Sequence, residues 1–167
     1  MSSRVEQPAM SWAQLDSPIG CLTIICDGEG IREIRFANNS AALLAECESN
    51  SEYLNPALEQ LSAYFEGRLT TFDLPLSLHG SRFQQAVWAQ LQTVAHGTTA
   101  SYGEVAAALG KPKAARAVGM ANNKNPIPII IPCHRIIGSK GALTGYAGGL
   151  DSKRWLLRHE GVGIRGE

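Results

Sequence analysis

The chain has 167 residues, 44% of them hydrophobic, and a formal net charge of zero. This length suits one compact domain or two small ones with a real apolar core. The sequence has no run of about 18 apolar residues, and residues 1–10 lack the apolar stretch of a secretory signal. We therefore expect neither a membrane span nor export, and a cytoplasmic location, or a nuclear one in a eukaryote.

The neutral total conceals an uneven distribution of charge. Residues 1–81 carry four basic and eleven acidic side chains, a net −7, whereas residues 82–167 carry eleven basic and four acidic ones, a net +7. This split favours a polyanionic partner for the second half, although chance segregation of surface charge is the plain alternative. The cysteines, Cys21, Cys26, Cys47 and Cys133, lack the spacing of a zinc site, so we expect reduced thiols, a reducing compartment and no bound metal.

The first half of the sequence has the pattern of a small α/β domain. Residues 12–16 and 21–26 have strand-like composition and flank Ser17-Pro18-Ile19-Gly20, which predicts a hairpin turn. Residues 31–36 alternate apolar and charged side chains, as a half-buried strand does. The sequence therefore predicts a short antiparallel sheet.

Helices are expected to follow these strands. Residues 41–47 and 55–65 have helical patterns, and Asn55-Pro56 would form the cap and first turn of the second helix. Residues 74–78 are expected to be extended.

A boundary is predicted at His79-Gly80-Ser81, which separates a domain at residues 1–80 from one at residues 81–167. Ser81 is a suitable N-cap for a helix. Apolar side chains then recur at helical spacing, at Phe83, Val87, Leu91 and Val94. The second domain is thus expected to be mainly helical.

A further short helix is expected from Ser101 to Gly110. Ser101 and Glu104 have the spacing of a capping box, and Gly110 closes the helix. Its predicted apolar stripe consists of Val105, Ala108 and Leu109.

The next helix, residues 114–119, follows the turn Lys111-Pro112-Lys113. It is rich in small side chains, and Lys113 and Arg116 lie three residues apart, which predicts that they share a face. A helix-turn-helix places such a second helix in a DNA groove. Most helix pairs of this length serve only to pack the core. This pattern alone therefore does not decide between a DNA-binding helix-turn-helix and an ordinary pair of packed helices.

Pro132-Cys133-His134-Arg135 follows the apolar run 126–131 and is the strongest chemical signal in the chain. A cysteine is a good nucleophile only as the thiolate, which a neighbouring base or positive charge makes accessible. The alternative is a buried structural cysteine beside an ordinary histidine.

Several blocks of this sequence together resemble one family, the O6-alkylguanine-DNA alkyltransferases, also called methylated-DNA–protein-cysteine methyltransferases. The resemblance is dense from Phe83 to Gly161 and weaker before it, at Asp16–Gly20 and Tyr64-Phe65. The blocks are Arg116–Gly119, Asn125-Pro126, Ile129–Arg135, Gly145–Leu150 and Trp155–Gly161.

The resemblance implies an N-terminal α/β domain like ribonuclease H, followed by a mainly α domain with a winged-helix-like helix-turn-helix. It implies direct repair of O6-alkylguanine, and of O4-alkylthymine in some cases, in double-stranded DNA. The alkyl group would pass to Cys133 once per molecule, without a cofactor, and the protein would act as a monomer.

The resemblance also implies roles for individual residues. Cys133 would accept the alkyl group, His134 would take the thiol proton through a water, and Glu160 would hold the imidazole in the required tautomer. Asn125 would tie the helix-turn-helix to the active-site segment. The residues alone also allow Glu160 to be a surface acid at a helix end, and Asn125-Pro126 to be a simple turn.

A lesion inside a duplex must be flipped out before it can react. By resemblance, Arg116 would fill the vacated stack, and Tyr102 would rotate the phosphate and touch the extruded nucleotide. Binding through the minor groove would use Tyr102, Lys113, Ala114, Ala115, Arg116, Ala117 and Gly119. The pocket would be lined by Tyr102, Ile136, Tyr146, Ala147 and Gly148. Some members have serine in place of Ala147, but the backbone N–H that would contact O6 is unchanged.

Two other functions fit parts of the sequence. A DNA-binding module, such as a repressor or lesion sensor, would explain the helix pair and the charge split but not the thiol. A cysteine hydrolase would explain Cys133 and His134 but would leave the basic half and Arg116 without a role.

Overall fold

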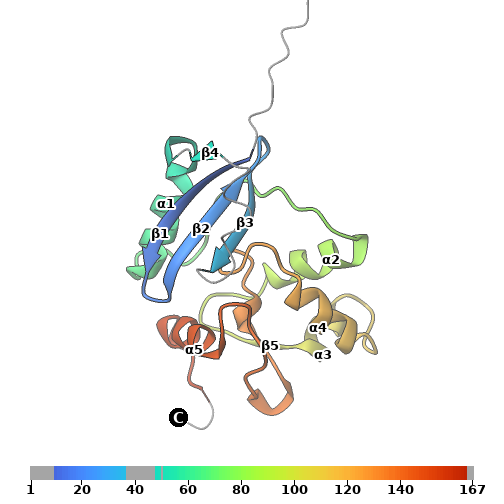
Figure 1. The fold of residues 1–167 in the computed structure, drawn as a ribbon. Helices are drawn as coiled ribbons and strands as arrows, with labels where there is room; N and C mark the ends of the chain where they lie inside the picture. The colour runs from blue at the N-terminus through green and yellow to red at the C-terminus, as the bar shows by residue number, and fades with distance from the viewer. Residues whose placement is uncertain (1–9, 37–47, 50, 165–167) are drawn as a thin grey trace, which may run out of the picture. The chain divides into compact units, whose positions relative to one another are not determined.

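The computed structural model describes residues 10–36, 48–49 and 51–164, and Figure 1 shows their path. The chain divides into two compact units, Met1–Ser77 and Leu78–Glu167. None of the helices in the described ranges is long and apolar enough to cross a membrane.

The N-terminal unit is built on a sheet with the strand order β3-β2-β1-β4. Strands β1 (Ser11–Ser17) and β2 (Gly20–Cys26) form an antiparallel hairpin, and β3 (Ile31–Phe36) pairs antiparallel with β2. The three predicted strands and the predicted turn are therefore confirmed. Strand β4 (Glu48–Ser49) pairs parallel with β1, so the sheet is mixed rather than purely antiparallel as predicted.

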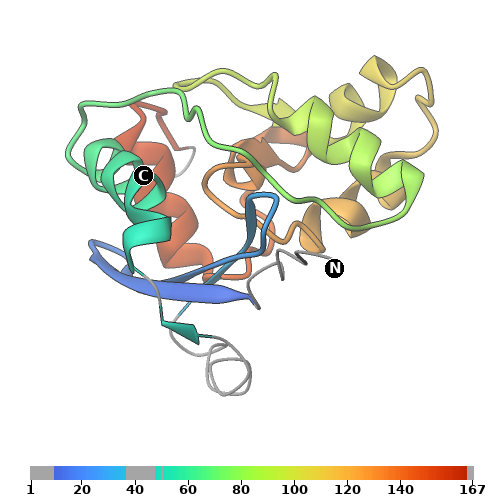
Figure 2. The same ribbon diagram turned by 90° about the horizontal axis from the view of Figure 1, so that it is seen from above.

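Helix α1 (Ser51–Phe65) packs against β1 and β2 on one face of this sheet (Figure 2). It begins before the predicted cap at Asn55, and Pro56 lies inside it. Leu54, which precedes the proline, is fully buried, so the packing of this added turn outweighs the backbone hydrogen bond that Pro56 cannot donate. The helix predicted at residues 41–47 lies outside the described residues.

The segment predicted to be extended at residues 74–78 makes one parallel bridge, from Leu76 to Ile31. The backbone N–H of Ser77 also donates to the carbonyl of Ile31 at 2.7 Å. These bonds tie the end of the unit to β3.

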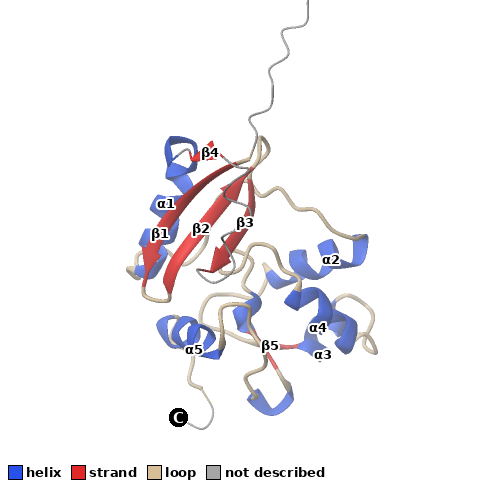
Figure 3. Cartoon of the chain, viewed as in Figure 1, coloured by secondary structure: helices blue, strands red, loops and turns tan. Residues whose placement is uncertain are grey.

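The C-terminal unit is mainly helical, as predicted (Figure 3). Its α-helices are α2 (Arg82–Leu91), α3 (Tyr102–Ala108), α4 (Ala115–Asn123) and α5 (Leu150–His159), and two short parallel strands pair with each other, β5 (Ala100–Ser101) and β6 (Ile136–Ile137). Ser81 and Ser101 cap α2 and α3 with complete capping boxes, which confirms both sequence signals.

Helices α2, α3 and α4 pack on one another and place α4 at the surface. The indole N–H of Trp88, a buried residue of α2, donates to the carbonyl of Ala121 in α4 at 2.9 Å. Val118 of α4 is fully buried, whereas Arg116 and Ala117 are exposed. One face of α4 is therefore fixed to the core and another remains open.

Two details of the predicted helix pair are wrong. The predicted apolar stripe of α3 included Ala108, but Ala108 is exposed. The inner face of this short helix instead carries Val105 and Ala106, which are buried. Helix α4 begins at Ala115, so Lys113 lies in the turn and does not share a helical face with Arg116. Gly110, with a φ of 74°, lies just past α3, as a glycine that ends a helix does.

Candidate active site and nucleic-acid interface

Cys133, His134 and Arg135 form a single turn of 3₁₀ helix, so the chain turns at this motif instead of continuing as an extended segment. The backbone N–H of Arg135 donates to the carbonyl of Pro132 at 3.0 Å. All three side chains are buried, with His134 fully so. A buried polar side chain needs partners, and the structure shows them for His134 and Arg135.

Glu160, the residue after α5, is the shared partner of both basic side chains. Its carboxylate lies 2.7 Å from Nε2 of His134, and it accepts two hydrogen bonds from Arg135, at 2.7 Å from Nε and 3.0 Å from Nη2. Arg135 also donates from Nη1 to the carbonyl of Val94 at 2.7 Å. The side chain of Glu160 has no exposed surface, so the structure excludes the surface acid that the sequence also allowed.

Burial sets the protonation of the two reactive groups. It raises the pKa of the Cys133 thiol to about 11, while the Asn125 side chain and the charge of Lys153 act in the opposite direction. Burial also lowers the pKa of His134 below its ordinary value, against the effect of Glu160. At neutral pH the resting site therefore holds a thiol and a neutral imidazole.

The two ring nitrogens of His134 differ in their surroundings. Nε2 lies next to Glu160, whereas Nδ1 is buried and forms no hydrogen bond with any residue that the structure describes. A carboxylate beside Nε2 favours a proton on that nitrogen. The lone pair of Nδ1 is then available to accept a proton.

Asn125 fixes the segment that joins α4 to Cys133. Its side chain donates to the carbonyl of Ile131 at 2.8 Å and accepts from the backbone N–H of Ile127 at 3.0 Å. Between them, Ile129 is buried and has a φ of 78°, a conformation that costs free energy for a β-branched residue. The Asn125 bonds help to hold this strained segment, which is more than a simple turn requires.

Lys153 of α5 is a buried cation that the sequence analysis did not select. Its ammonium group donates to the carbonyl of Ile136 at 2.7 Å and to that of Thr144 at 3.2 Å. Burial lowers its pKa to about 8. The available signal was its spacing, since Lys153 lies three and four residues before the buried Leu156 and Leu157 and so shares their face.

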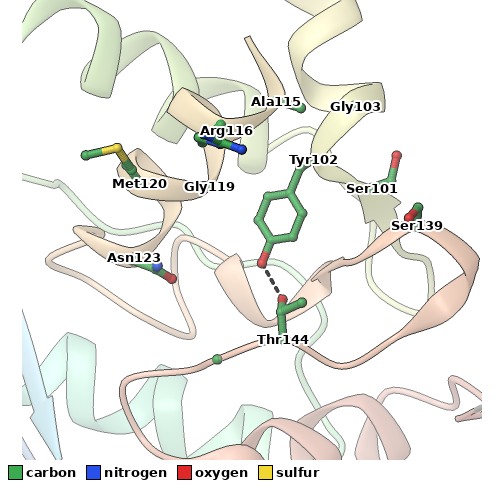
Figure 4. A pocket seen from close by; sticks show the side chains of 11 residues that line it. Ser101, Tyr102, Gly103, Ala115, Arg116, Gly119, Met120, Asn123, Ser139 and Thr144 are labelled. Atoms are coloured by element: carbon green, nitrogen blue, oxygen red, sulfur yellow. Dashed lines mark hydrogen bonds between the residues drawn. The ribbon is translucent and has the colours of Figure 1, made fainter. Parts of the chain in front are cut away.

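A pocket of about 650 Å³ lies between α3, α4 and the segment 139–145 (Figure 4). Tyr102 points across it from the start of α3, and its hydroxyl hydrogen-bonds to that of Thr144. Gly119 lies beside the tyrosine ring, where an added Cβ would be 3.7 Å away. The lining residues are Ser101, Tyr102, Gly103, Ala115, Arg116, Gly119, Met120, Asn123, Ser139, Thr144 and Gly145.

The structure brings together only some of the predicted DNA-contacting and pocket residues. Tyr102, Ala115, Arg116 and Gly119 line this pocket, whereas Lys113 and Ala117 are exposed and Ala114 half-buried outside it. The predicted pocket residues that do not line it are Ile136, which is buried in β6, Tyr146 and Gly148, which are half-buried, and Ala147, which is exposed. Cys133 does not line it either.

Within the described residues, no group of three or more histidine, cysteine, aspartate or glutamate side chains could hold a metal ion.

Comparison with known proteins identifies two matching family models. Residues 10–78 match the ribonuclease-like domain of 6-O-methylguanine DNA methyltransferase, and residues 82–162 match the DNA-binding domain of the same family. The methylated-DNA–protein-cysteine methyltransferase of Methanosarcina acetivorans is 46% identical over 154 residues, which are 91% of this chain and 99% of that protein. The protein of this name from Mycobacterium tuberculosis is 47% identical over 153 residues, 87% of this chain and 89% of its own.

Solved structures give the same result. A crystal structure of the M. tuberculosis O6-methylguanine methyltransferase matches with a TM-score of 0.85 and 46% identity, covering 90% of this chain and 92% of that one. A second, of the M. tuberculosis protein in complex with DNA, matches with a TM-score of 0.84 and 47% identity over the same shares. The chain therefore belongs to the 6-O-methylguanine DNA methyltransferase family, which repairs DNA by transferring an alkyl group to a cysteine of the protein itself.

Proposed function

We propose that Cys133 is the alkyl acceptor and that His134 and Glu160 activate it. The observation that carries this proposal is the hydrogen bond between the buried His134 and Glu160, one residue from a buried thiol. Cys21 and Cys26 lie instead in strand β2 of the N-terminal sheet.

The proposed reaction begins with the thiol, because burial keeps Cys133 protonated at neutral pH. Its proton passes through a water to Nδ1 of His134, and Glu160 stabilises the imidazolium that forms. The sulfur then forms a bond to the alkyl carbon while the bond from that carbon to guanine O6 breaks, with its electron pair going to the guanine. The proton from the thiol neutralises the guanine, so the sum is a thioether and a repaired base.

Arg135 contributes to this arrangement by compensating the charge of Glu160. Without it, the buried carboxylate of Glu160 would have no permanently charged partner. The guanidinium of Arg135 also makes His134 less basic, because a neighbouring positive charge disfavours the imidazolium. Arg135 is thus a positioning residue of the site in our proposal.

We place duplex DNA against the open face of α4, with the helix entering the minor groove. Arg116 is exposed at the mouth of the pocket beside Tyr102, where it can fill the stack left by a flipped base. The small Ala115 and Gly119 permit close approach of the backbone. The net +7 of residues 82–167 favours a polyanion and no particular sequence.

The proposal is tested by incubating the protein with a duplex oligonucleotide that carries O6-methylguanine and then weighing its peptides. One methyl group on the peptide that contains Cys133 is expected. Tight binding with no adduct would instead indicate a lesion sensor, and hydrolysis of small esters a cysteine hydrolase. A thioether has no good leaving group, so the repaired guanine should not exceed one per protein molecule.

A further inference from the structure

Thr144 makes two hydrogen bonds that point in different directions. Its hydroxyl bonds to that of Tyr102 across the pocket (Figure 4), and its carbonyl accepts from the ammonium group of Lys153 at 3.2 Å. The same ammonium group donates to the carbonyl of Ile136 at 2.7 Å. A continuous chain of bonds thus runs from Tyr102 through Thr144 and Lys153 to Ile136, the residue that follows the 3₁₀ turn of Cys133.

This chain joins parts that are otherwise separate in sequence. Tyr102 begins α3, Thr144 lies in the irregular segment before α5, and Ile136 begins β6. Residues 142–148 have no regular secondary structure, so few backbone bonds fix the place of Thr144. The lysine is the anchor, since a buried ammonium group is held strongly to the carbonyls that solvate it.

We propose that Thr144 is a positioning residue, which holds the Tyr102 side chain at a fixed distance from the segment that carries Cys133. This inference rests on the proposed function, in which Tyr102 contacts the flipped nucleotide. Gly119 has no side chain to pack on the Tyr102 ring, since even an added Cβ would lie 3.7 Å from it. The Thr144 hydroxyl supplies a constraint on the ring, and preorganised contacts of this kind favour the reacting geometry.

The test is a double-mutant cycle on Thr144→Val, which keeps the side-chain shape, and Tyr102→Phe, which removes the other hydroxyl. Rates are measured under single-turnover conditions over a range of duplex concentrations, so that the maximal transfer rate and the half-saturating concentration are separated. Thr144→Val should lower the maximal rate about three- to tenfold, the range expected for one net hydrogen bond. Thr144→Ser keeps the hydroxyl and should restore the rate to within about twofold of wild type.

The decisive result is the double variant. If Thr144 acts through Tyr102, Thr144→Val should have no further effect once Tyr102 is phenylalanine. Full multiplication of the two rate losses, or a Thr144→Val variant with the wild-type rate, would overturn the inference. Thr98→Val is the matched control, because the Thr98 hydroxyl donates to a carbonyl, that of Ala95, but lies outside the pocket.

Thermal unfolding of each variant separates positioning from folding. Thr144→Ala removes the same hydroxyl with less bulk, so a folding defect specific to valine does not decide the outcome. A wild-type protein that leaves Cys133 unmodified would overturn the proposed function and this inference with it. An active wild type with a fully active Thr144→Ala variant would overturn this inference alone.

Discussion

Glu160→Ala should destabilise the protein far more than most single substitutions. The lost carboxylate has no exposed surface, and it accepts hydrogen bonds from Arg135 while also partnering His134. The Arg135 side chain, only 7% exposed, would keep its bond to the carbonyl of Val94 but lose its counter-charge. Breaking a buried ion pair on one side typically costs about 3–5 kcal/mol, because the other charge remains buried and unpaired.

Glu160→Ala should also slow alkyl transfer. A second variant separates this effect on the rate from the effect on stability. His134→Ala removes the proposed base but leaves the pair of Arg135 and Glu160 intact, so it should cost less stability than Glu160→Ala. If the histidine and the glutamate act as one unit, the fold reduction in transfer rate of the double variant should be smaller than the product of the two single fold reductions. Strict multiplication would show that Glu160 is merely structural.

Urea unfolding followed by intrinsic fluorescence measures the stability, and single-turnover transfer measures the rate. The matched control is Asp151→Ala, since Asp151 also pairs with an arginine, Arg154, at 3.2 Å but has a fully exposed side chain. That pair should contribute nothing measurable. A loss below about 1 kcal/mol for Glu160→Ala would refute the reasoning, because it would mean that Arg135 finds water or another partner.

Cys133→Ala should abolish transfer and leave duplex binding intact, whereas Cys21→Ala should leave both unchanged; mass spectrometry and fluorescence anisotropy check this. Because burial lowers the pKa of His134 from its ordinary value of 6.5, the acid limb of the pH–rate profile should be centred below that pH. An acid limb centred at or above it would contradict the assignment. Duplex affinity should fall steeply with salt and with Arg116→Ala, and salt-insensitive binding would argue against a phosphate-dominated interface. Met120 is 67% exposed on the α4 face beside Arg116, so Met120→Ala should weaken duplex binding as well, since methionine side chains can wedge into a minor groove.

The elements that the sequence predicted well have strong local signals. The hairpin at residues 17–20, the N-cap at Ser81 and the capping box at Ser101 depend on residues within three positions of one another, and all three are present. The start of α1 was missed because a buried Leu54 overrides what Asn55-Pro56 would do alone. Tertiary packing, not local propensity, sets that helix end.

The site residues show the same limit at longer range. Pairing between His134 and Glu160 was implied by the family resemblance, but the shared role of Arg135 was not, because a hydrogen bond across 25 residues leaves no local pattern. Lys153 and Thr144 were missed for a related reason. A lysine on an amphipathic helix is usually solvated, and only the fold shows that this one is surrounded by carbonyls.

The buried Cys133 has a consequence for the protein while it waits for a lesion. Because burial raises its pKa to about 11, Cys133 is held almost entirely as the thiol at pH 7. Peroxides and soluble electrophiles react mainly with the thiolate, so they should react very slowly with Cys133 in the resting protein. If Cys133 is the acceptor that we propose and reacts only once, this protects it from oxidation until a flipped guanine lies in the site beside His134.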